Sequence, residues 1–232
     1  MSSVTKPRIY SISAIDNRTG IGYGGCDFIN CEDKKMRVQP LYKYTDVLGV
    51  QSILGEKWGN VREGECFFIA CHIGLRACDL LELKFEQFKK NHIKVIEKKT
   101  GKTRIIVQTD VLRKSIETLR AWYKEKGIEP IYLFQATSRC SAKRQKPISQ
   151  TYYYKKINEA CEAIGIDQNV GTHTARKTFG YHLYKQTGNL AIVQDILNHA
   201  SERETRKYIG ITDKRTQDAV ASLDFSKPCE EM

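Results

Sequence analysis

His173-Thr174-Ala175-Arg176 opens the stretch that decides the fold, and the stretch closes at Tyr208. Two apolar segments with helical spacing fill it: the first holds Phe179, Tyr181, Leu183 and Tyr184, and the second, after Gly188, holds Leu190, Ile192, Val193, Ile196 and Leu197. Residues three apart lie on one face of a helix, so we expect His173 and Arg176 to point at the same spot. His199 ends the second segment, and Tyr208 follows it nine residues later.

The side chains in this stretch are those that phosphoryl transfer needs. An imidazole can move a proton, and a guanidinium is a planar, two-pronged donor suited to phosphate. A tyrosine hydroxyl can attack phosphorus if its proton is withdrawn. If these groups converge, they predict phosphoryl transfer through a covalent tyrosyl intermediate.

Their order and spacing resemble the tyrosine recombinase (phage integrase) family. That family's C-terminal motif reads His-x-x-Arg, then Leu-Gly-His about 22 residues after the arginine, then a nucleophilic tyrosine about nine residues further on. Here the gaps are 23 residues from Arg176 to His199 and nine to Tyr208. Two residues depart from the family pattern: Asn198 stands where glycine is usual, and Lys177 stands where histidine or arginine is common. The resemblance covers residues 42–223.

An arginine follows a glycine turn in Gly74-Leu75-Arg76-Ala77-Cys78-Asp79-Leu80. The apolar segment after it predicts a helix, and backbone N–H groups at a helix N-terminus favour anions. A surface arginine, or a structural pair with Asp79, is the alternative interpretation. The string resembles the family's first arginine box, and we interpret Asp79 as a structural group that braces Arg76.

The apolar period then changes from 3.6 to 2, which predicts an antiparallel hairpin. Ile93 and Val95 on one side and Ile105 and Val107 on the other flank a lysine-rich tip. The resemblance implies that one hairpin lysine enters the minor groove and protonates the leaving 5′-hydroxyl. Lys99 is the first candidate, with Lys98 and Lys102 as alternates because hairpin register is uncertain by one or two residues. The alternative interpretation is a soluble turn.

The resemblance implies a role for each group. Tyr208 is the nucleophile, His173 its base and Lys99 the general acid, while Arg76, Arg176 and His199 bind the non-bridging phosphate oxygens. The product is a 3′-phosphotyrosyl bond and a free 5′-hydroxyl. We expect no cofactor, ATP or metal, because the sequence has no phosphate-binding glycine loop and no paired carboxylates placed for two metals.

Positive charge is concentrated in one part of the chain. Residues 84–156 hold 19 Lys and Arg against 6 Asp and Glu, a local excess larger than the net charge of +11 of the whole chain. Such a concentration predicts a polyanion partner, here double-stranded DNA, although a solvated lysine-rich face would look the same. The predicted DNA contacts are Lys98, Lys102, Arg104, Lys177 and, in the loop of residues 138–147, Arg139, Lys143, Arg144 and Lys146.

Composition places the chain among globular proteins of a reducing compartment. None of the eight cysteines forms a Cys-x-x-Cys pair, and Cys66, Cys71 and Cys78 lie in apolar helical sequence, which favours core packing over a metal site. No apolar run approaches the roughly 18 residues that a membrane span needs, and no signal peptide is evident. We therefore expect a cytoplasmic, nucleoid-associated protein without membrane contact.

The predicted fold class is α+β, mainly α-helical, with a small antiparallel sheet and the tyrosine recombinase catalytic-domain fold. Residues 1–41 are an N-terminal arm or hairpin, 42–223 the catalytic domain and 224–232 a C-terminal tail. Helices are expected near residues 45–54, 61–72, 111–126 and 149–164, with a last one bearing Ala219, Val220 and Leu223. The resemblance implies an N-terminal DNA-binding domain in most family members, whereas only about 40 residues precede the predicted catalytic domain here. The two alternatives are a recombinase of the catalytic domain alone and a half clamp that an accessory DNA-binding protein assists. The resemblance also implies a homo-tetramer on DNA.

Three functions compete on this sequence. The first is a site-specific recombinase (integrase, resolvase or invertase), the second a type IB topoisomerase with the same chemistry, and the third a non-catalytic DNA-binding module. Both enzymatic functions, the recombinase and the topoisomerase, require Arg76 and Arg176 to share one anion pocket.

Overall fold

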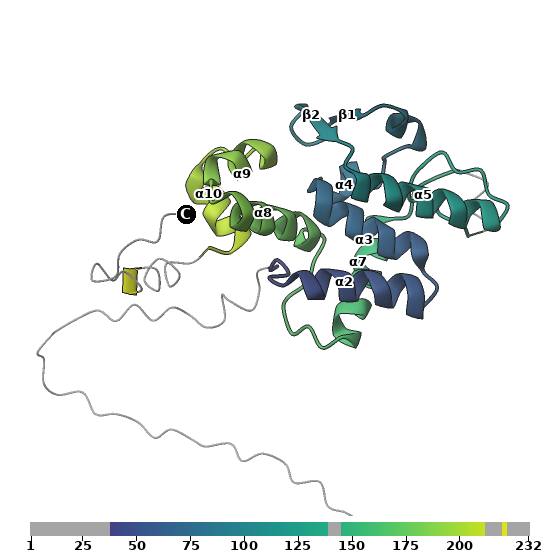
Figure 1. The fold of residues 1–232 in the computed structure, drawn as a ribbon, viewed down its shortest axis with the longest axis horizontal. Coiled ribbons are helices and arrows are strands. Elements are labelled where there is room, and N and C mark those ends of the chain that lie inside the picture. The colour runs from purple at the N-terminus through teal and green to yellow at the C-terminus, as the bar shows by residue number, and fades with distance from the viewer. Residues whose placement is uncertain (1–37, 139–144, 212–219, 222–232) are drawn as a thin grey trace, which may run out of the picture.

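The computed structural model describes residues 38–138, 145–211 and 220–221. These residues form a mostly helical protein with one two-stranded antiparallel sheet, as the sequence predicts. Figure 1 shows α8, α9 and α10 gathered at one end, α2, α3, α5 and α7 at the other, and the hairpin above α4. Within the described ranges, no helix is both long enough and apolar enough to cross a bilayer.

The first helices confirm the predicted periodicity. Helix α2 spans Tyr44–Ser52 and continues as the short π-helix η1, Ile53–Lys57. Helix α3 spans Val61–Ile73 and ends at Gly74, which adopts the left-handed conformation with φ 59°. A Cβ at Gly74 would also lie 2.2 Å from the Phe179 ring, so only glycine lets α8 pack this closely on the end of α3.

The predicted hairpin is present. Arg76 precedes the short helix α4, Ala77–Leu80, and the 3₁₀ helix η2, Phe85–Lys89, leads to the sheet. Strand β1, His92–Ile96, pairs antiparallel with β2, Thr103–Val107, with Lys94 opposite Ile105. Residues of β1 alternate between exposed and buried, which is the period of 2 that the sequence shows.

Two longer helices follow, and each begins at a hydroxyl cap. Helix α5, Asp110–Glu125, starts after Thr109, whose side chain accepts the Leu112 N–H. Helix α7, Gln150–Ala163, starts after Ser149, whose side chain accepts the Tyr152 N–H. In α7, Tyr153 is fully buried and Tyr152 donates to Glu63 at 2.8 Å. These two tyrosines are packing residues rather than exposed DNA contacts.

Helices α8 (Thr174–Thr187), α9 (Leu190–Leu197) and α10 (Glu202–Ile209) enclose a second, smaller core. That core consists of Tyr181, Val193, Leu197 and Ile209. A Cβ at Gly180 would lie 2.8 Å from Ile209 and 3.0 Å from Leu197, so α8 meets both partner helices at this glycine. The small core therefore positions α10, the helix that carries Tyr208.

The main core joins α2, α3, α4, α5, α7 and the hairpin to the start of α8. Residues 38–41, the end of the predicted arm, also pack here: Leu41 is fully buried, and its N–H donates to Thr178 at 2.9 Å. Cys66 and Cys161 are buried and reduced, and burial raises the pKa of both thiols. Core packing is thus confirmed for Cys66.

Some predictions fall outside the described residues. These are the arm over residues 1–37, the DNA contacts Arg139, Lys143 and Arg144, and the tail of residues 224–232. The predicted last helix lies mostly outside as well, since only Val220 and Ala221 of it are described, and both are helical and exposed.

Candidate active site

Arg76 and Arg176, 100 residues apart in the chain, meet at one carboxylate. Arg76 Nη1 donates to Glu97 Oε2 at 2.6 Å, and Arg176 Nη1 lies 3.6 Å from Glu97 Oε1. Glu97 follows β1, Arg76 caps α4 and Arg176 lies in the first turn of α8. The two guanidinium groups that the chemistry requires near one point therefore lie together around Glu97.

Two helix ends hold Arg176 in place. Its Nη1 donates to Gly74 O at 2.7 Å, just after α3, and its Nη2 donates to Leu197 O at 2.8 Å, at the end of α9. The last carbonyls of a helix lack intrahelical partners, so a guanidinium satisfies them well. Arg176 is almost fully buried, and burial lowers the pKa of its guanidinium below the ordinary value. Its position is fixed by the backbone of two other helices.

Tyr208 and His173 face each other beside these arginines, whose charges act on both side chains. The phenol Oη lies 3.3 Å from His173 Nδ1, a distance at which the hydroxyl donates to a neutral imidazole. Burial raises the pKa of the Tyr208 phenol, which Arg176 and Arg76 partly offset. Burial, followed by the charge of Arg176, lowers the pKa of His173. The phenol is therefore protonated and the imidazole neutral at pH 7, as a nucleophile and its base should be.

His199 packs on the other side of the phenol. The two rings are 4.7 Å apart in an edge-to-face arrangement, and His199 Nδ1 lies 3.1 Å from Thr205 Oγ1. His199 follows Asn198, which adopts the left-handed conformation with φ 52°. Asparagine tolerates that conformation better than most residues, which explains how it can replace the usual glycine.

The hairpin lysines point in different directions. Lys98 forms an exposed ion pair with Glu82. Lys99 is exposed, and its positive charge is one of the causes that lower the pKa of His173, so it lies on the side of the proposed base. Lys102 is exposed at the far side of the turn. This geometry favours Lys99 over Lys98 as the general acid.

With this geometry in view, the chain can be compared with known proteins. A sequence profile described as the phage integrase family matches residues 51–215. The chain belongs to this family.

Related members differ in length. A Bacillus subtilis (strain 168) protein named "Probable integrase/recombinase YoeC" is 36% identical over 183 residues, which are 78% of this chain and 94% of that protein. Tyrosine recombinase XerA of Pyrococcus horikoshii is 27% identical over 163 residues, 69% of this chain and 54% of that one. The chain thus spans about half the length of the XerA relative.

A solved structure of XerH site-specific recombinase bound to palindromic difH substrate matches with a TM-score of 0.61 at 20% identity. The match covers 80% of this chain and 54% of that one. A XerA recombinase structure also matches with a TM-score of 0.61, at 18% identity, over 82% of this chain and 66% of that chain. At this identity the likeness shows the fold, which is the catalytic-domain fold of tyrosine recombinases.

Two predicted roles need correction in this phage integrase family member, and Lys177 has a contact that the sequence did not predict. Arg104 was expected to contact DNA, but its guanidinium turns inward and donates to the carbonyls of Gly74, at 2.9 Å, and Ile73. Burial and the neighbouring Arg176 lower its pKa to about 10. Arg104 therefore caps the end of α3 instead.

The other correction concerns Asp79. Its Oδ1 accepts the backbone N–H of Lys98 at 3.0 Å, so this carboxylate braces the hairpin, and Glu97 is the group that braces Arg76. Lys177, expected on DNA, donates to Val38 O at 2.8 Å and lies 4.9 Å from the Tyr208 ring centroid. Lys177 therefore lies beside the proposed nucleophile in this structure, and its DNA contact stays a prediction. Lys146 is exposed and its DNA contact stays a prediction.

Glu97 is the site residue that the sequence analysis missed. It is fully buried, and its Oε2 also accepts from Thr100 Oγ1 at 2.9 Å and Asn198 Nδ2 at 3.3 Å. The signal was present in the pattern: with period 2, Glu97 follows Ile93 and Val95 on the inward face. A charged residue at an inward position needs partners of opposite charge.

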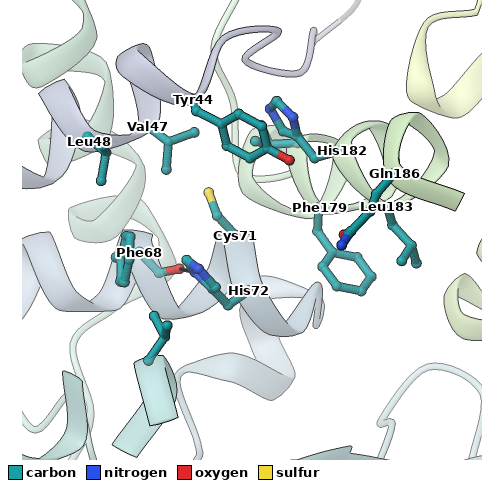
Figure 2. Close-up of a pocket in the computed structure, with 12 residues that line it drawn as sticks. Tyr44, Val47, Leu48, Phe68, Cys71, His72, Phe179, His182, Leu183 and Gln186 are labelled. Atoms are coloured by element: carbon teal, nitrogen blue, oxygen red, sulfur yellow. Dashed lines mark hydrogen bonds between the residues drawn. The ribbon is translucent and has the colours of Figure 1, made fainter. Parts of the chain in front are cut away.

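An apolar groove of about 570 Å³ lies away from these groups, between α2, α3 and α8. Figure 2 shows Tyr44 beside His182 on one side, with Cys71 and Phe179 further in. None of the predicted catalytic residues lines it. Across the described ranges, no three His, Cys, Asp or Glu side chains are grouped so that they could hold a metal ion.

Proposed function

We propose that this protein is a site-specific DNA recombinase that cleaves and rejoins DNA strands through a 3′-phosphotyrosyl intermediate. One observation carries the proposal: Tyr208 Oη lies 3.3 Å from a neutral imidazole, beside two guanidinium groups that share one buried carboxylate. A hydroxyl, a base and two cations around one point are what attack on a phosphodiester requires.

In the cleavage step, Tyr208 Oη forms a bond to the scissile phosphorus while His173 accepts the phenol proton. Arg76, Arg176 and His199 donate to the non-bridging oxygens and neutralise the charge that develops on them. The bond from phosphorus to the 5′-oxygen breaks, and Lys99 gives that oxygen a proton. The product carries a 3′-phosphotyrosyl bond and a free 5′-hydroxyl, and attack by another 5′-hydroxyl reverses the step.

The proposed substrate is double-stranded DNA bound by a homo-oligomer. Solved structures of lambda integrase with the same fold are a dimer on a core site and a tetramer on a Holliday junction. For this chain we propose a tetramer on DNA, helped by an accessory DNA-binding protein and located on the nucleoid in the cytoplasm. Lys102 and Lys146, both exposed, are proposed phosphate contacts.

The test is covalent trapping on a nicked duplex, whose short 5′ fragment diffuses away after cleavage. Because the target site is unknown, the probe is a pool of nicked duplexes with a randomised core, and adducts are recovered and sequenced. We expect the wild-type chain to form an adduct in excess EDTA, and Tyr208→Phe to bind the selected DNA with unchanged affinity but form none.

Two results would contradict this proposal: undiminished trapping by Tyr208→Phe, or a requirement for Mg²⁺. Joined strands from two different duplexes would distinguish a recombinase from a topoisomerase, which relaxes one duplex. The selected sequence would then serve as the substrate in the experiments below.

A further inference from the structure

Glu97 lies beneath the proposed phosphate pocket rather than inside it. Its side chain is fully enclosed, whereas the Arg76 side chain that covers it is 15% exposed. The charges of both arginines act on Tyr208 and His173, so these two side chains lie near the same guanidinium groups. A phosphate would therefore approach the outer edges of the guanidinium groups, while the carboxylate holds them from behind.

The carboxylate balances an unusual concentration of positive charge. Arg76, Arg104 and Arg176 interact electrostatically with one another, and Glu97 is the acidic group that faces all three. Burial alone would raise the pKa of the Glu97 carboxyl, but the hydrogen bonds from Arg76 and Thr100 and the two arginine charges hold it below its ordinary value. Glu97 is therefore ionised at pH 7, and its loss would leave three guanidinium groups to repel each other.

Each contact of Glu97 comes from a different part of the active site. Arg76 is the N-cap of α4, Arg176 lies in α8, and Asn198 is the C-cap of α9, in the turn that leads to α10. Asn198 Nδ2 donates to Glu97 Oε2 at 3.3 Å, and Asn198 directly precedes His199. One side chain thus links the hairpin that carries Lys99 to the turn that leads to His199 and Tyr208.

Arg76 has one hydrogen bond to Glu97, through Nη1. A guanidinium has five N–H donors in a fixed plane, so fixing one edge also sets the direction of the others. Glu97 Oε1 lies 3.6 Å from Arg176 and has no hydrogen-bond partner among the described residues. Oε1 therefore faces Arg176 as an ion pair without a hydrogen bond.

We propose that Glu97 is a positioning residue for DNA cleavage: it orients Arg76 and Arg176 toward the scissile phosphate, and Asn198 couples it to the turn that carries His199. The inference rests on the proposed function, because it assigns Glu97 to the same reaction. It adds a role that the catalytic groups themselves do not fill, since Glu97 acts through the arginines and does not touch the substrate.

The experiment compares Glu97→Gln with the wild-type chain on the trapped DNA sequence. Glu97→Gln keeps size and an acceptor oxygen but removes the charge, and Glu82→Gln is the matched control, because Glu82 pairs with the exposed Lys98. We expect the single-turnover cleavage rate of Glu97→Gln to fall about 10²-fold, as for a misplaced catalytic group, with DNA affinity changed less than about threefold. Glu82→Gln should cleave like the wild type.

A second readout separates positioning from a folding defect. On a DNA with a methylphosphonate at the scissile position, one negative charge is gone and the arginines have less to neutralise. We expect the rate loss of Glu97→Gln to shrink to about tenfold on this substrate, as it should for Arg76→Ala. An equal loss on both substrates would overturn the proposal.

Asn198 offers a milder test that keeps the fold. Asn198→Gly introduces the residue best suited to the left-handed conformation and removes the amide that donates to Glu97. We expect a rate loss of about tenfold, and the double variant with Glu97→Gln should be no slower than Glu97→Gln alone, because both act through one contact. If Asn198→Gly and Glu97→Gln both cleave at the wild-type rate, the inference is overturned, while the covalent adduct still supports the proposed function. If the wild-type chain forms no adduct, the proposed function itself is refuted.

Discussion

At the scale of single residues, burial acts on the two proton-transfer partners in opposite directions. It raises the pKa of the Tyr208 phenol and lowers the pKa of the His173 imidazole, since in both cases the low dielectric disfavours the charged form. The free pair is therefore neutral. In the proposed reaction, a bound phosphate and the arginines would stabilise the charge separation that the attack requires.

The first residue-scale prediction concerns pH. The pKa of His173 lies below its ordinary 6.5, so the neutral base persists as pH falls to 6.5 and is lost only at lower pH. We expect single-turnover cleavage to fall on acidification with a midpoint below pH 6.5. His173→Asn should be slow throughout and lack this fall, whereas His199→Asn should keep it. A rate that rises as pH drops would contradict His173 as the base.

The second residue-scale prediction concerns the leaving group. Lys99→Met should slow cleavage about 10²–10⁴-fold, the usual contribution of a general acid, while Lys98→Met should have little effect because Lys98 pairs with Glu82. In a DNA with sulfur in place of the 5′-bridging oxygen, the leaving group is a thiolate, which needs no proton. On that substrate Lys99→Met should regain most of the wild-type rate, and Tyr208→Phe should regain none. Rescue of Lys98→Met alone would reassign the acid.

At the scale of elements, the small core of α8, α9 and α10 sets the distance between the arginine helix and the nucleophile helix. Arg176 lies on α8 and Tyr208 on α10. Ile209, the residue after Tyr208, is on the buried side of α10 and packs against Gly180 of α8. The same α8 holds Arg176 against the ends of α3 and α9. A change in this packing therefore reaches the chemistry without touching a catalytic side chain.

Gly180→Ala tests this connection. The added methyl would lie 2.8 Å from Ile209 Cγ2, so the Ile209 side chain or α10 itself must shift. Such overpacking costs about 1–3 kcal/mol, partly offset by the better helix propensity of alanine. We expect a lower melting temperature and cleavage slowed about 10-fold or more. The control is Gly55→Ala, where the nearest atom is 3.9 Å away; equal behaviour of both variants would exclude the effect.

At the scale of the whole molecule, the location of the positive charge is more informative than the net charge. The excess of Lys and Arg over residues 84–156 spreads over η2, the hairpin, α5 and α7. Part of it is structural, since Arg104 caps α3. Most of the remaining Lys and Arg side chains in the described part of this range are exposed. We expect them to bind a polyanion through release of counterions, which makes the binding depend on salt.

DNA binding should consequently weaken steeply with salt. For about six phosphate contacts we expect a loss of about 10³-fold in affinity between 50 and 200 mM salt. Lys146→Ala should reduce the slope of log K against log salt by about 1, because it removes one contact. Arg104→Ala should leave the slope unchanged and lower the melting temperature. Fluorescence anisotropy over a salt series measures the slope, and a reduced slope in Arg104→Ala would restore its predicted DNA contact.

The sequence by itself determined the elements and the identity of the main site groups. Apolar spacing placed α3, α5, α7, α8 and α9 nearly at their observed bounds, and period 2 placed the hairpin, because these patterns depend on residues close in the chain. The motif order predicted Arg76, His173, Arg176, His199 and Tyr208 as one site. The structure places these side chains near one another, and their roles stay predictions. Lys99 could be named only to within the register of the turn.

Only the tertiary structure decided which charges pair. Glu97 lies on the inward face of the hairpin, but its partners Arg176 and Asn198 are about 80 and 100 residues away, and no local pattern records such contacts. Arg104 likewise could not be distinguished from the other basic hairpin residues by sequence, because its partner at the end of α3 is distant in the chain. Where a buried charge finds its counter-charge depends on how the chain returns in space, because burial removes the water that would otherwise satisfy it.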